Sequence, residues 1–522
     1  MSGNAIGRRA FLKTTALATA AAATSTPPSL ASEALGRRLS QPDTRSMSIP
    51  AGGAIDFFDP RTVEHTYFLD RRVTPVTKHA SNPLLADCMP KTILPKDGGG
   101  FRIWYATRTW LPRQDGKGKR TEHDLCYAES ADGVTWEVPE LGLKERNGSR
   151  ANNILIKPND RDAKGEQLTG SGGIEGWHVV DAEQSPMPKA RGRYTAMYLS
   201  ALKKGGGVCL AHSDDGLRWT GYSENPVFRH WSDTANCFFH DARIGRYVFY
   251  HRPMAHMHAG IPSANRLMAR VESDDLINWD NARVVLDTDA RDAAAFSKVR
   301  NARGRDKQWY AMLVSPYQDF YLGVAWYLVE VTGYFDTRLV YSFDGVDWRR
   351  EPGEEPWIAP AEYGGWDAGL IAGRLPLFAG DENRCYYGGC NMNHSYKMMN
   401  DRKSIDYGLG LATVKRGRLA GYHAPPEAGD KAELLTRPFL LDKPQLRINA
   451  DAAKGQIKVA LTGETGAAIS GCSYADAMPI RQDGLDVPLR WKGSRDLSDL
   501  VGKPIRARVK AENAAIYGLS TG

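Results

Sequence analysis

The sequence lacks the motifs that hold redox cofactors. It has no G-x-G-x-x-G between a strand and a helix, no C-x-x-C pair and no C-x-x-C-H for haem attachment. We therefore expect no bound redox cofactor. The chain has only seven cysteines, an odd number that cannot form a complete disulfide framework. Most of them are predicted to be small buried hydrophobic residues.

A large charge of one sign and long hydrophobic runs are also missing. The formal net charge is +7 over 522 residues, which indicates no nucleic acid or other polyanion as a partner. The apolar stretch at 14–23 is too short to span a bilayer permanently. Hydrophobic residues nevertheless make up 42% of the chain, enough for the cores of one large and one small domain.

The N-terminus carries the pattern of an export signal. Residues 7–13 read G-R-R-A-F-L-K, and the apolar stretch is followed by the small residues Ser29 and Ala31. We predict a twin-arginine signal peptide over 1–31, cleaved near Ala31, and a flexible segment over 32–55. The mature protein is then expected in the periplasm or secreted, without a membrane partner. The alternative interpretation of these residues is a disordered tail.

One short pattern recurs four times. It reads S-A-D-G-V-T-W from Ser130, S-D-D-G-L-R-W from Ser213, S-D-D-L-I-N-W from Ser273 and S-F-D-G-V-D-W from Ser342. Each copy follows a short predicted strand and turns the chain into a second one that delivers a tryptophan. In the third copy Leu276 replaces the glycine, so that turn must avoid positive φ or tolerate it at a cost.

Aromatic-rich strands precede these hairpins and give the architecture. They start at Phe101, Arg193, Arg246 and Lys307, and a fifth at Arg384 precedes a hairpin without the signature. Adding one apolar strand in front of each gives five units of about four strands, as in propeller blades. A series of β-sandwiches or a β-helix is the alternative. We predict an all-β protein, with a five-bladed β-propeller over 56–433 and, where the tryptophan hairpins stop, a small C-terminal β-sandwich over 434–522.

This combination resembles a known superfamily. The hairpin signature, the five units and the trailing sandwich are similar to the five-bladed glycoside hydrolases of families 32, 43 and 68, and most similar to bacterial proteins grouped with family 32. The likeness covers residues 57–522, and its most specific piece runs from Cys126 to 155. The family 32 motifs Asn-Asp-Pro-Asn-Gly, Arg-Asp-Pro and Glu-Cys are not intact here. The resemblance implies a glycosidase fold without indicating fructan as the substrate.

In a propeller, the loops that enter the innermost strands converge at one mouth of the funnel. Five such loops can be identified, and each contains a carboxylate. Glycoside hydrolysis needs a carboxylic acid that protonates the leaving oxygen and a carboxylate that acts as base or nucleophile. By analogy of blade position, Asp87 is our candidate base or nucleophile and Asp233 the orienting carboxylate, with either Glu175 or Glu362 as the acid. The further carboxylates in these loops are Asp292 and Asp367.

Aromatic and polar neighbours of these carboxylates suit a sugar pocket. Trp177, Trp231 and Trp366 stand beside three of the acids, and an aromatic face stacks on the C–H face of a sugar ring. His178 and Asn236 are candidate partners for sugar hydroxyls. For each single position, a structural role in a loop or core is the competing interpretation.

No metal site is predicted, because His256, His258 and His394 do not form a recognised ligand set, although a calcium ion on the axis remains an alternative. The predicted function is an exported glycosidase acting on an oligo- or polysaccharide. One alternative is a carbohydrate-binding propeller without catalysis. Another is a sialidase-like enzyme, which would need six units and three arginines around the substrate carboxylate. The sequence indicates neither the sugar nor the oligomeric state.

Overall fold

A computed structural model of the 522-residue chain describes residues 47–48, 54–112, 119–253, 266–292, 307–350, 355–401 and 404–521. The predicted signal peptide, most of the predicted flexible segment, His256 and His258 lie outside these residues. The described chain is almost entirely β, as expected from the sequence, and its only helical elements are short 3₁₀ turns. No helix among the described residues has the length and apolar character needed to cross a membrane.

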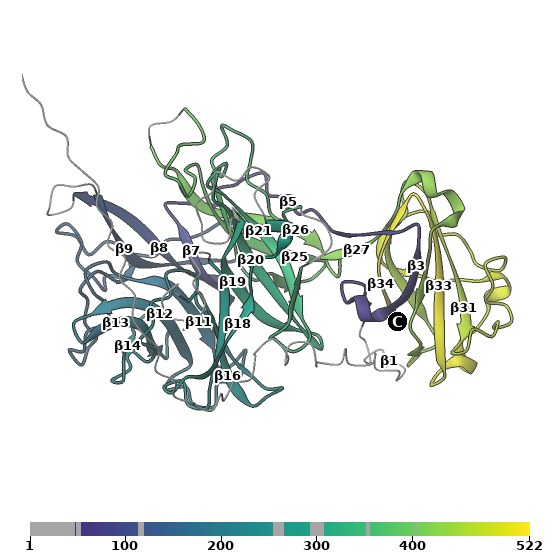
Figure 1. The fold of residues 1–522 in the computed structure, drawn as a ribbon, viewed down its shortest axis with the longest axis horizontal. Coiled ribbons are helices and arrows are strands. Elements are labelled where there is room, and N and C mark those ends of the chain that lie inside the picture. The colour runs from purple at the N-terminus through teal and green to yellow at the C-terminus, as the bar shows by residue number, and fades with distance from the viewer. Residues whose placement is uncertain are drawn as a thin grey trace, which may run out of the picture. The chain divides into compact units, whose positions relative to one another are not determined.

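Three four-stranded antiparallel sheets follow one another along the chain (Figure 1). The first sheet contains β7 (Met89–Pro95), β8 (Phe101–Pro112), β9 (Lys119–Ser130) and β10 (Ile154–Ile156). The second contains β11 (Glu175–Asp181), β12 (Tyr194–Leu202), β13 (Gly205–Ser213) and β14 (Thr220–Gly221). The third contains β15 (Cys237–Asp241), β16 (Arg246–His251), β17 (Met268–Ser273) and β18 (Asp280–Leu286). The central strands carry buried aromatic residues, among them Trp104, Tyr198 and Phe249, which suits strands with two covered faces.

The next two groups of strands form one ten-stranded sheet together with β5 and β6. The first group comprises β19 (Lys307–Tyr317), β20 (Phe320–Val329), β21 (Tyr334–Ser342) and β22 (Trp348–Arg350), and the second comprises β23 (Leu370–Gly373), β24 (Leu377–Ala379), β25 (Glu382–Cys390) and β26 (Tyr407–Lys415). A single parallel pair, Phe335 with Leu370, joins the two groups. The free side of β26 pairs with β5 (Thr77–Lys78) and β6 (Leu85–Ala86), so strands from the start of the chain complete this sheet.

The β19 group differs from the sequence prediction in one respect. The aromatic-rich strand at Lys307 was expected to be the second of its unit. Among the described residues, which leave out 293–306, β19 is the first strand of its group and the aromatic β20 is the second. Composition could not separate the two strands because both are rich in apolar and aromatic residues.

The four Ser-x-Asp repeats form the same turn. In the first, the Asp132 carboxylate accepts hydrogen bonds from the backbone N–H groups of Val134 and Thr135, both at 2.7 Å. The Ser130 hydroxyl accepts from the N–H of Gly133 at 2.8 Å. Matching bonds occur in the turns at Ser213, Ser273 and Ser342. These local side-chain bonds satisfy the turn's backbone, which explains why serine and aspartate recur at these positions.

Three of these turns are bonded to another sheet through the carbonyl oxygen of their glycine. The Tyr386 hydroxyl donates to Gly133 O at 2.7 Å, the Trp104 indole to Gly216 O at 2.8 Å and the Tyr250 hydroxyl to Gly345 O at 2.8 Å. We call these three bonds the turn latches. They join the first sheet to β25, the second sheet to the first, and the β19 group to the third sheet.

The fourth turn uses apolar packing instead. Leu276 takes the glycine position with a φ of 71°, close to the values of 74° to 78° at the three glycines. Its side chain is fully buried in a cluster that also contains Met197 and Leu199 of the second sheet. Of the two options for this turn, the structure shows the second, because Leu276 tolerates positive φ and gains hydrophobic burial.

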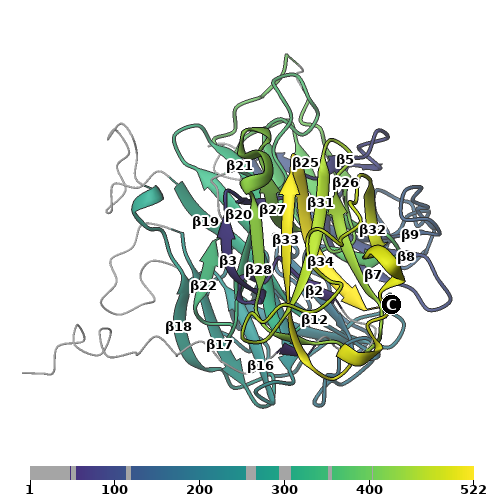
Figure 2. The same cartoon turned by 90° about the vertical axis from the view of Figure 1, so that its right-hand side faces the viewer.

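The C-terminal part contains two six-stranded sheets (Figure 2). One comprises β1 (Met47–Ser48), β3 (Val63–Tyr67), β28 (Glu433–Thr436), β29 (Phe439–Leu440), β31 (Gln456–Gly463) and β33 (Pro504–Glu512). The other comprises β2 (Ala54–Asp56), β4 (Asp70–Val73), β27 (Ala420–Ala424), β30 (Leu446–Asp451), β32 (Asp483–Pro488) and β34 (Ala514–Thr521). Both contribute to one hydrophobic cluster, for example through Val459 and Val509 from the first and Ile448 and Ile516 from the second.

The division at residue 433 drawn from the sequence does not coincide with these sheets. Strands β2, β3 and β4 lie within or next to the segment predicted to start the propeller, yet they pair with β34, β28 and β27. Strand β3 reads V-E-H-T-Y and carries no alternation that would indicate its partner.

All seven cysteines are buried and unbonded to one another, which confirms their predicted role as small core residues.

Candidate active site

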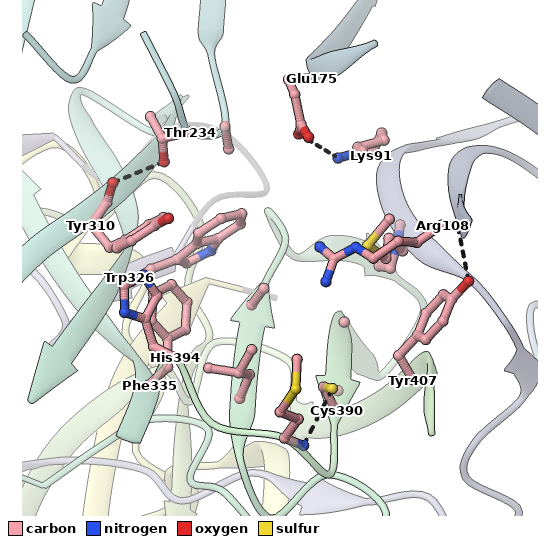
Figure 3. A pocket seen from close by; sticks show the side chains of 18 of the residues that line it. Lys91, Arg108, Glu175, Thr234, Tyr310, Trp326, Phe335, Cys390, His394 and Tyr407 are labelled. Carbon is pink, nitrogen blue, oxygen red and sulfur yellow. Dashed lines mark hydrogen bonds and ion pairs between the residues drawn. The ribbon is translucent and has the colours of Figure 1, made fainter. Parts of the chain in front are cut away.

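A cavity of about 270 Å³ lies where the first strands of several sheets meet. Residues of β7, β8, β11 and β23 line it, together with the loop before β15 and the loop around His394. Its wall is rich in aromatic side chains, with Tyr310, Trp326 and Phe335 on one side and Tyr407 on another (Figure 3). Such a mixture of apolar walls and few polar groups is typical of a small-molecule site.

Glu175 lines this cavity at the start of β11. One of its oxygens lies 2.6 Å from His123 Nδ1 and the other 3.8 Å from Lys91 Nζ. Burial opposes ionisation of this carboxyl, but Lys91, His123 and Arg108 outweigh it and lower its pKa to about 2. The side chain still exposes 42% of its surface. Glu175 is therefore an ionised carboxylate that a ligand in the cavity can reach.

Asp233 lines the same cavity from the loop before β15. Its carboxylate accepts a hydrogen bond from Arg252 Nη2 at 2.9 Å, and more than half of its side chain is exposed. Arg252 is buried and its guanidinium lies over the Tyr310 ring at 4.5 Å, which fixes the direction of the ion pair. The cavity thus contains two carboxylates supplied by neighbouring sheets.

Asp87 lies beside the cavity rather than in its lining. It is exposed, its φ is 52°, and its backbone N–H donates to Tyr407 O at 3.0 Å. Tyr407 and Cys88, which do line the cavity, flank it. Burial raises the pKa of the Tyr407 hydroxyl, and the nearby charge of Asp87 raises it further.

The other predicted carboxylates are not part of the cavity lining. Glu362 is exposed in its loop. Asp367 is buried, 2.6 Å from Lys78 Nζ, and accepts a hydrogen bond from the Tyr387 hydroxyl at 2.9 Å. Asp292 is buried against Arg350 and the Tyr327 hydroxyl. Asp367 and Asp292 are thus held by internal partners, and residues 293–306 that follow Asp292 lie outside the described chain.

The predicted sugar-stacking tryptophans occupy different environments. The Trp177 ring is 1% exposed and packs against Trp219 at 4.8 Å, so no ring face is left for a sugar. Trp366 stacks on Tyr387 at 6.0 Å. Trp231 is 40% exposed but is not among the residues lining the cavity.

The predicted hydroxyl-binding residues lie behind the lining. Asn236 is buried, and its amide lies close to Gly176, where a Cβ would be 2.6 Å from Nδ2. His178 lies 4.0 Å from the Cys237 sulfur. Burial and the nearby Arg374 lower the His178 pKa to about 4, so this imidazole is neutral at ordinary pH.

Sequence analysis missed the cations of the cavity. Lys91, Arg108 and Arg374 all line it, and the Arg108 guanidinium points toward the wall formed by Trp326, Phe335 and His394 (Figure 3). Lys91 lies on β7 only four residues after Asp87, so it stands close to a position that the sequence did single out. Arg374 directly follows β23 and Arg108 lies inside a strand, and neither position distinguishes them from other arginines. The fold brings these two arginines to one cavity, although they lie far apart in the sequence.

These cations do not suit a resident calcium ion, which needs six to eight oxygen ligands. Among the described residues there is no group of three or more His, Cys, Asp or Glu side chains that could hold a metal. His394 also lines the cavity, and its ring centre lies 5.2 Å from that of Tyr310.

The sequence matches no protein-family model and no curated protein. Among solved structures, it is similar to a β-1,2-mannobiose phosphorylase from Listeria innocua, at 11% identity and a TM-score of 0.45 over 66% of this chain and 98% of that one. A thermostable family-43 glycoside hydrolase matches at 12% identity and 0.40, over 63% and 91% of the chains. An N-acetylgalactosamine deacetylase from F. plautii matches at 15% and 0.37, over 68% and 97%. With TM-scores below 0.5, these likenesses assign neither a family nor an activity to this chain.

Proposed function

We propose that this protein is a glycoside hydrolase whose reaction takes place in the cavity between Glu175 and Asp233. The observation that carries the proposal is that two carboxylates from neighbouring sheets line one cavity with aromatic walls. Glycosidases use two such groups on either side of the scissile bond, and aromatic walls bind the C–H faces of sugars.

The electrostatics of Glu175 suggest how the two roles divide. A carboxyl with a pKa of about 2 is ionised at neutral pH and cannot supply a proton. We therefore assign Glu175 as the base or nucleophile and Asp233, the other carboxylate of the lining, as the group that protonates the leaving oxygen. The sequence had offered either Glu175 or Glu362 as the acid and Asp233 as the orienting carboxylate. Asp87, beside Tyr407, is the third carboxylate in this proposal.

The propeller architecture of the proposal has its own support. Two of the turn latches and the Leu276 cluster each connect a sheet to the one before it, and the third latch connects the first sheet to β25. These connections support a closed ring of five units, with β5 and β6 completing the last of them. The two C-terminal sheets around one hydrophobic cluster suit a β-sandwich.

Export by the twin-arginine route is part of the same proposal and is supported by the motif at 7–13. Replacing Arg8 and Arg9 with lysine should retain the protein in the cytoplasm at its precursor length. Normal processing and export of this variant would contradict the proposed route.

A second candidate function is glycan binding without catalysis. The observation in its favour is that both carboxylates already have cationic partners, Lys91 for Glu175 and Arg252 for Asp233. This candidate requires binding of a glycan with no release of sugar.

The test is a screen of the mature protein against polysaccharides and aryl glycosides, with Glu175→Gln and Asp233→Asn as variants. Glu175→Gln should lose turnover on every substrate. Asp233→Asn should lose turnover on unactivated glycans but keep more of it on aryl glycosides, whose leaving group needs no proton. Trp231→Ala, which lies outside the cavity lining, serves as the control. Binding without sugar release across the panel would support the second candidate instead.

A further inference from the structure

Arg374 is a buried cation whose guanidinium has no hydrogen-bonding or anionic partner among the described residues. It is 8% exposed, lines the cavity, and makes neither a side-chain hydrogen bond nor an ion pair with any described residue. Its Nε is fully buried without a hydrogen-bond partner. Its one charge–ring contact is with Trp326, whose ring centre lies 5.0 Å away.

The backbone holds Arg374 in this position. It lies at the break between β23 and β24, which both pair with β25, and Pro376 follows it two residues later. The Arg374 N–H still donates to Tyr386 O at 2.8 Å. A break of this kind redirects one side chain while the strand continues, as is common beside active sites.

An uncompensated buried charge is unfavourable. Removing a guanidinium from water carries a large desolvation penalty, and a single cation–π contact returns only part of it. The titratable group that acts electrostatically on Arg374 is the Cys88 thiol. Burial raises the pKa of Cys88, so this thiol stays neutral and offers no negative charge. The protein itself therefore supplies Arg374 with no anion among the described residues.

The other charged residues of the cavity lining do not neutralise Arg374. Lys91 and Arg108 are further cations of the lining, against the carboxylates Glu175 and Asp233. Asp233 is bonded to Arg252, and Glu175 lies against Lys91 and His123. The lining therefore contains three cations, Lys91, Arg108 and Arg374, against two carboxylates that already have cationic partners.

We propose that the cavity binds an oxyanion, with Arg374 as its principal donor and Arg108 and Lys91 as supporting cations. An arginine fork matches the two oxygens of a carboxylate, sulfate or phosphate. The oxyanion is either an acidic group on the glycan, such as a uronic acid carboxylate, or a free phosphate ion. The first source rests on the proposed function and narrows its substrate class to acidic glycans.

The test measures thermal stability of the mature protein with inorganic phosphate, with sulfate, and with glucuronate against glucose as its neutral match. At least one oxyanion should raise the Tm of the wild type. Arg374→Met should abolish or weaken this response, with an apparent Kd about 10- to 100-fold higher, because charge-assisted hydrogen bonds are lost. Its ligand-free Tm should be no lower than that of the wild type, because methionine removes a buried charge without breaking an ion pair.

Two further variants complete the experiment. Arg374→Lys, which keeps the charge without the fork, should retain a weakened response, and Arg218→Met, at an exposed arginine, should respond as the wild type does. A full response in Arg374→Met, or no response of the wild type to any of the oxyanions, would overturn the inference. Stabilisation by glucuronate but not glucose indicates an acidic glycan, whereas stabilisation by phosphate alone indicates a free ion.

The outcome is separable from that of the proposed function. If the wild type releases sugar from a neutral glycan and none of the oxyanions binds to it, the hydrolase assignment holds and the oxyanion site fails. If an oxyanion binds through Arg374 but no glycan is cleaved, the oxyanion site holds and the hydrolase assignment fails.

Discussion

The Tyr386 hydroxyl donates a hydrogen bond to the Gly133 carbonyl oxygen at 2.7 Å, across 253 positions of the chain. Tyr386 is fully buried on β25, and Gly133 belongs to the turn that ends β9. A Cβ at position 133 would lie 2.5 Å from the Tyr386 hydroxyl oxygen, so this close approach needs a glycine there.

Removing one turn latch should weaken the fold by a small, measurable amount. Tyr386→Phe leaves the buried Gly133 carbonyl without its hydroxyl partner, at a cost of about 1 kcal/mol in the free energy of unfolding. Tyr250→Phe should cost less, because the Gly345 carbonyl still accepts a hydrogen bond from the Trp348 indole at 3.2 Å. Because the two latches are far apart in the fold, the double variant should lose about the sum. Urea unfolding measures this, with the exposed Tyr363→Phe as the control. Losses no larger than that of the control would show that the latches do not stabilise the fold.

The turn at Leu276 allows a test with two opposing terms. Leu276→Gly relieves left-handed strain of about 1–2 kcal/mol but removes a fully buried side chain worth about 2–5 kcal/mol. We expect a net destabilisation of about 1–3 kcal/mol by urea unfolding. Leu276→Ala keeps the strain and loses most of the burial, so it should be the less stable variant. A stabilised glycine variant would mean that strain dominates at this turn.

The pair formed by Lys78 and Asp367 should be structural. Asp367 is 2% exposed and lies 2.6 Å from Lys78 Nζ on β5. Lys78→Met leaves a buried carboxylate without its cation and should cost about 3 kcal/mol, as seen in thermal or urea unfolding. The double variant Lys78→Met with Asp367→Leu should recover part of this loss. A fully stable Lys78→Met protein that has lost only turnover would restore Asp367 as a catalytic candidate.

Glu175 should make stability depend on acid pH. Its folded pKa of about 2 lies below the usual 4.5, so its contribution to stability is present above pH 4.5 and is lost as the pH falls toward 2. The wild type should therefore lose more stability than Glu175→Gln between pH 5 and pH 2. Glu427→Gln, at an exposed glutamate, should follow the wild type. Parallel curves for the wild type and Glu175→Gln would contradict the assignment of an ionised Glu175.

The parts of the fold that sequence could predict are those with local causes. The Ser-x-Asp turn is built from bonds within four residues, so its four copies were visible in the sequence. The position before a strand identified Glu175 and Asp233, which line the cavity, but it also selected Asp292, which is bonded to Arg350. Only the fold decides between these cases, because the partner lies far away in the chain.

The remaining features depend on long-range burial. The sequence V-E-H-T-Y of β3 does not indicate that its partner is β28, because an edge strand with mixed polarity fits several places. Arg374 resembles other arginines until the break after β23 and the surrounding lining bury it. The net charge of the whole chain could not indicate the three cations of the cavity lining, because it sums all charged residues without regard to where the fold places them.

The pairing of β5 and β6 with β26 has a consequence for the newborn chain. A ribosome adds roughly 5–20 residues each second, so Thr77 and Lys78 leave it tens of seconds before Thr413 and Ala412, their partners, are made. Until then the early strands have no ladder to join, and the sheets already synthesised remain an open series with unprotected edges. Completion of this fold therefore waits for the finished polypeptide, because a truncation before residue 407 would leave β2, β3, β4, β5 and β6 without the strands they pair with.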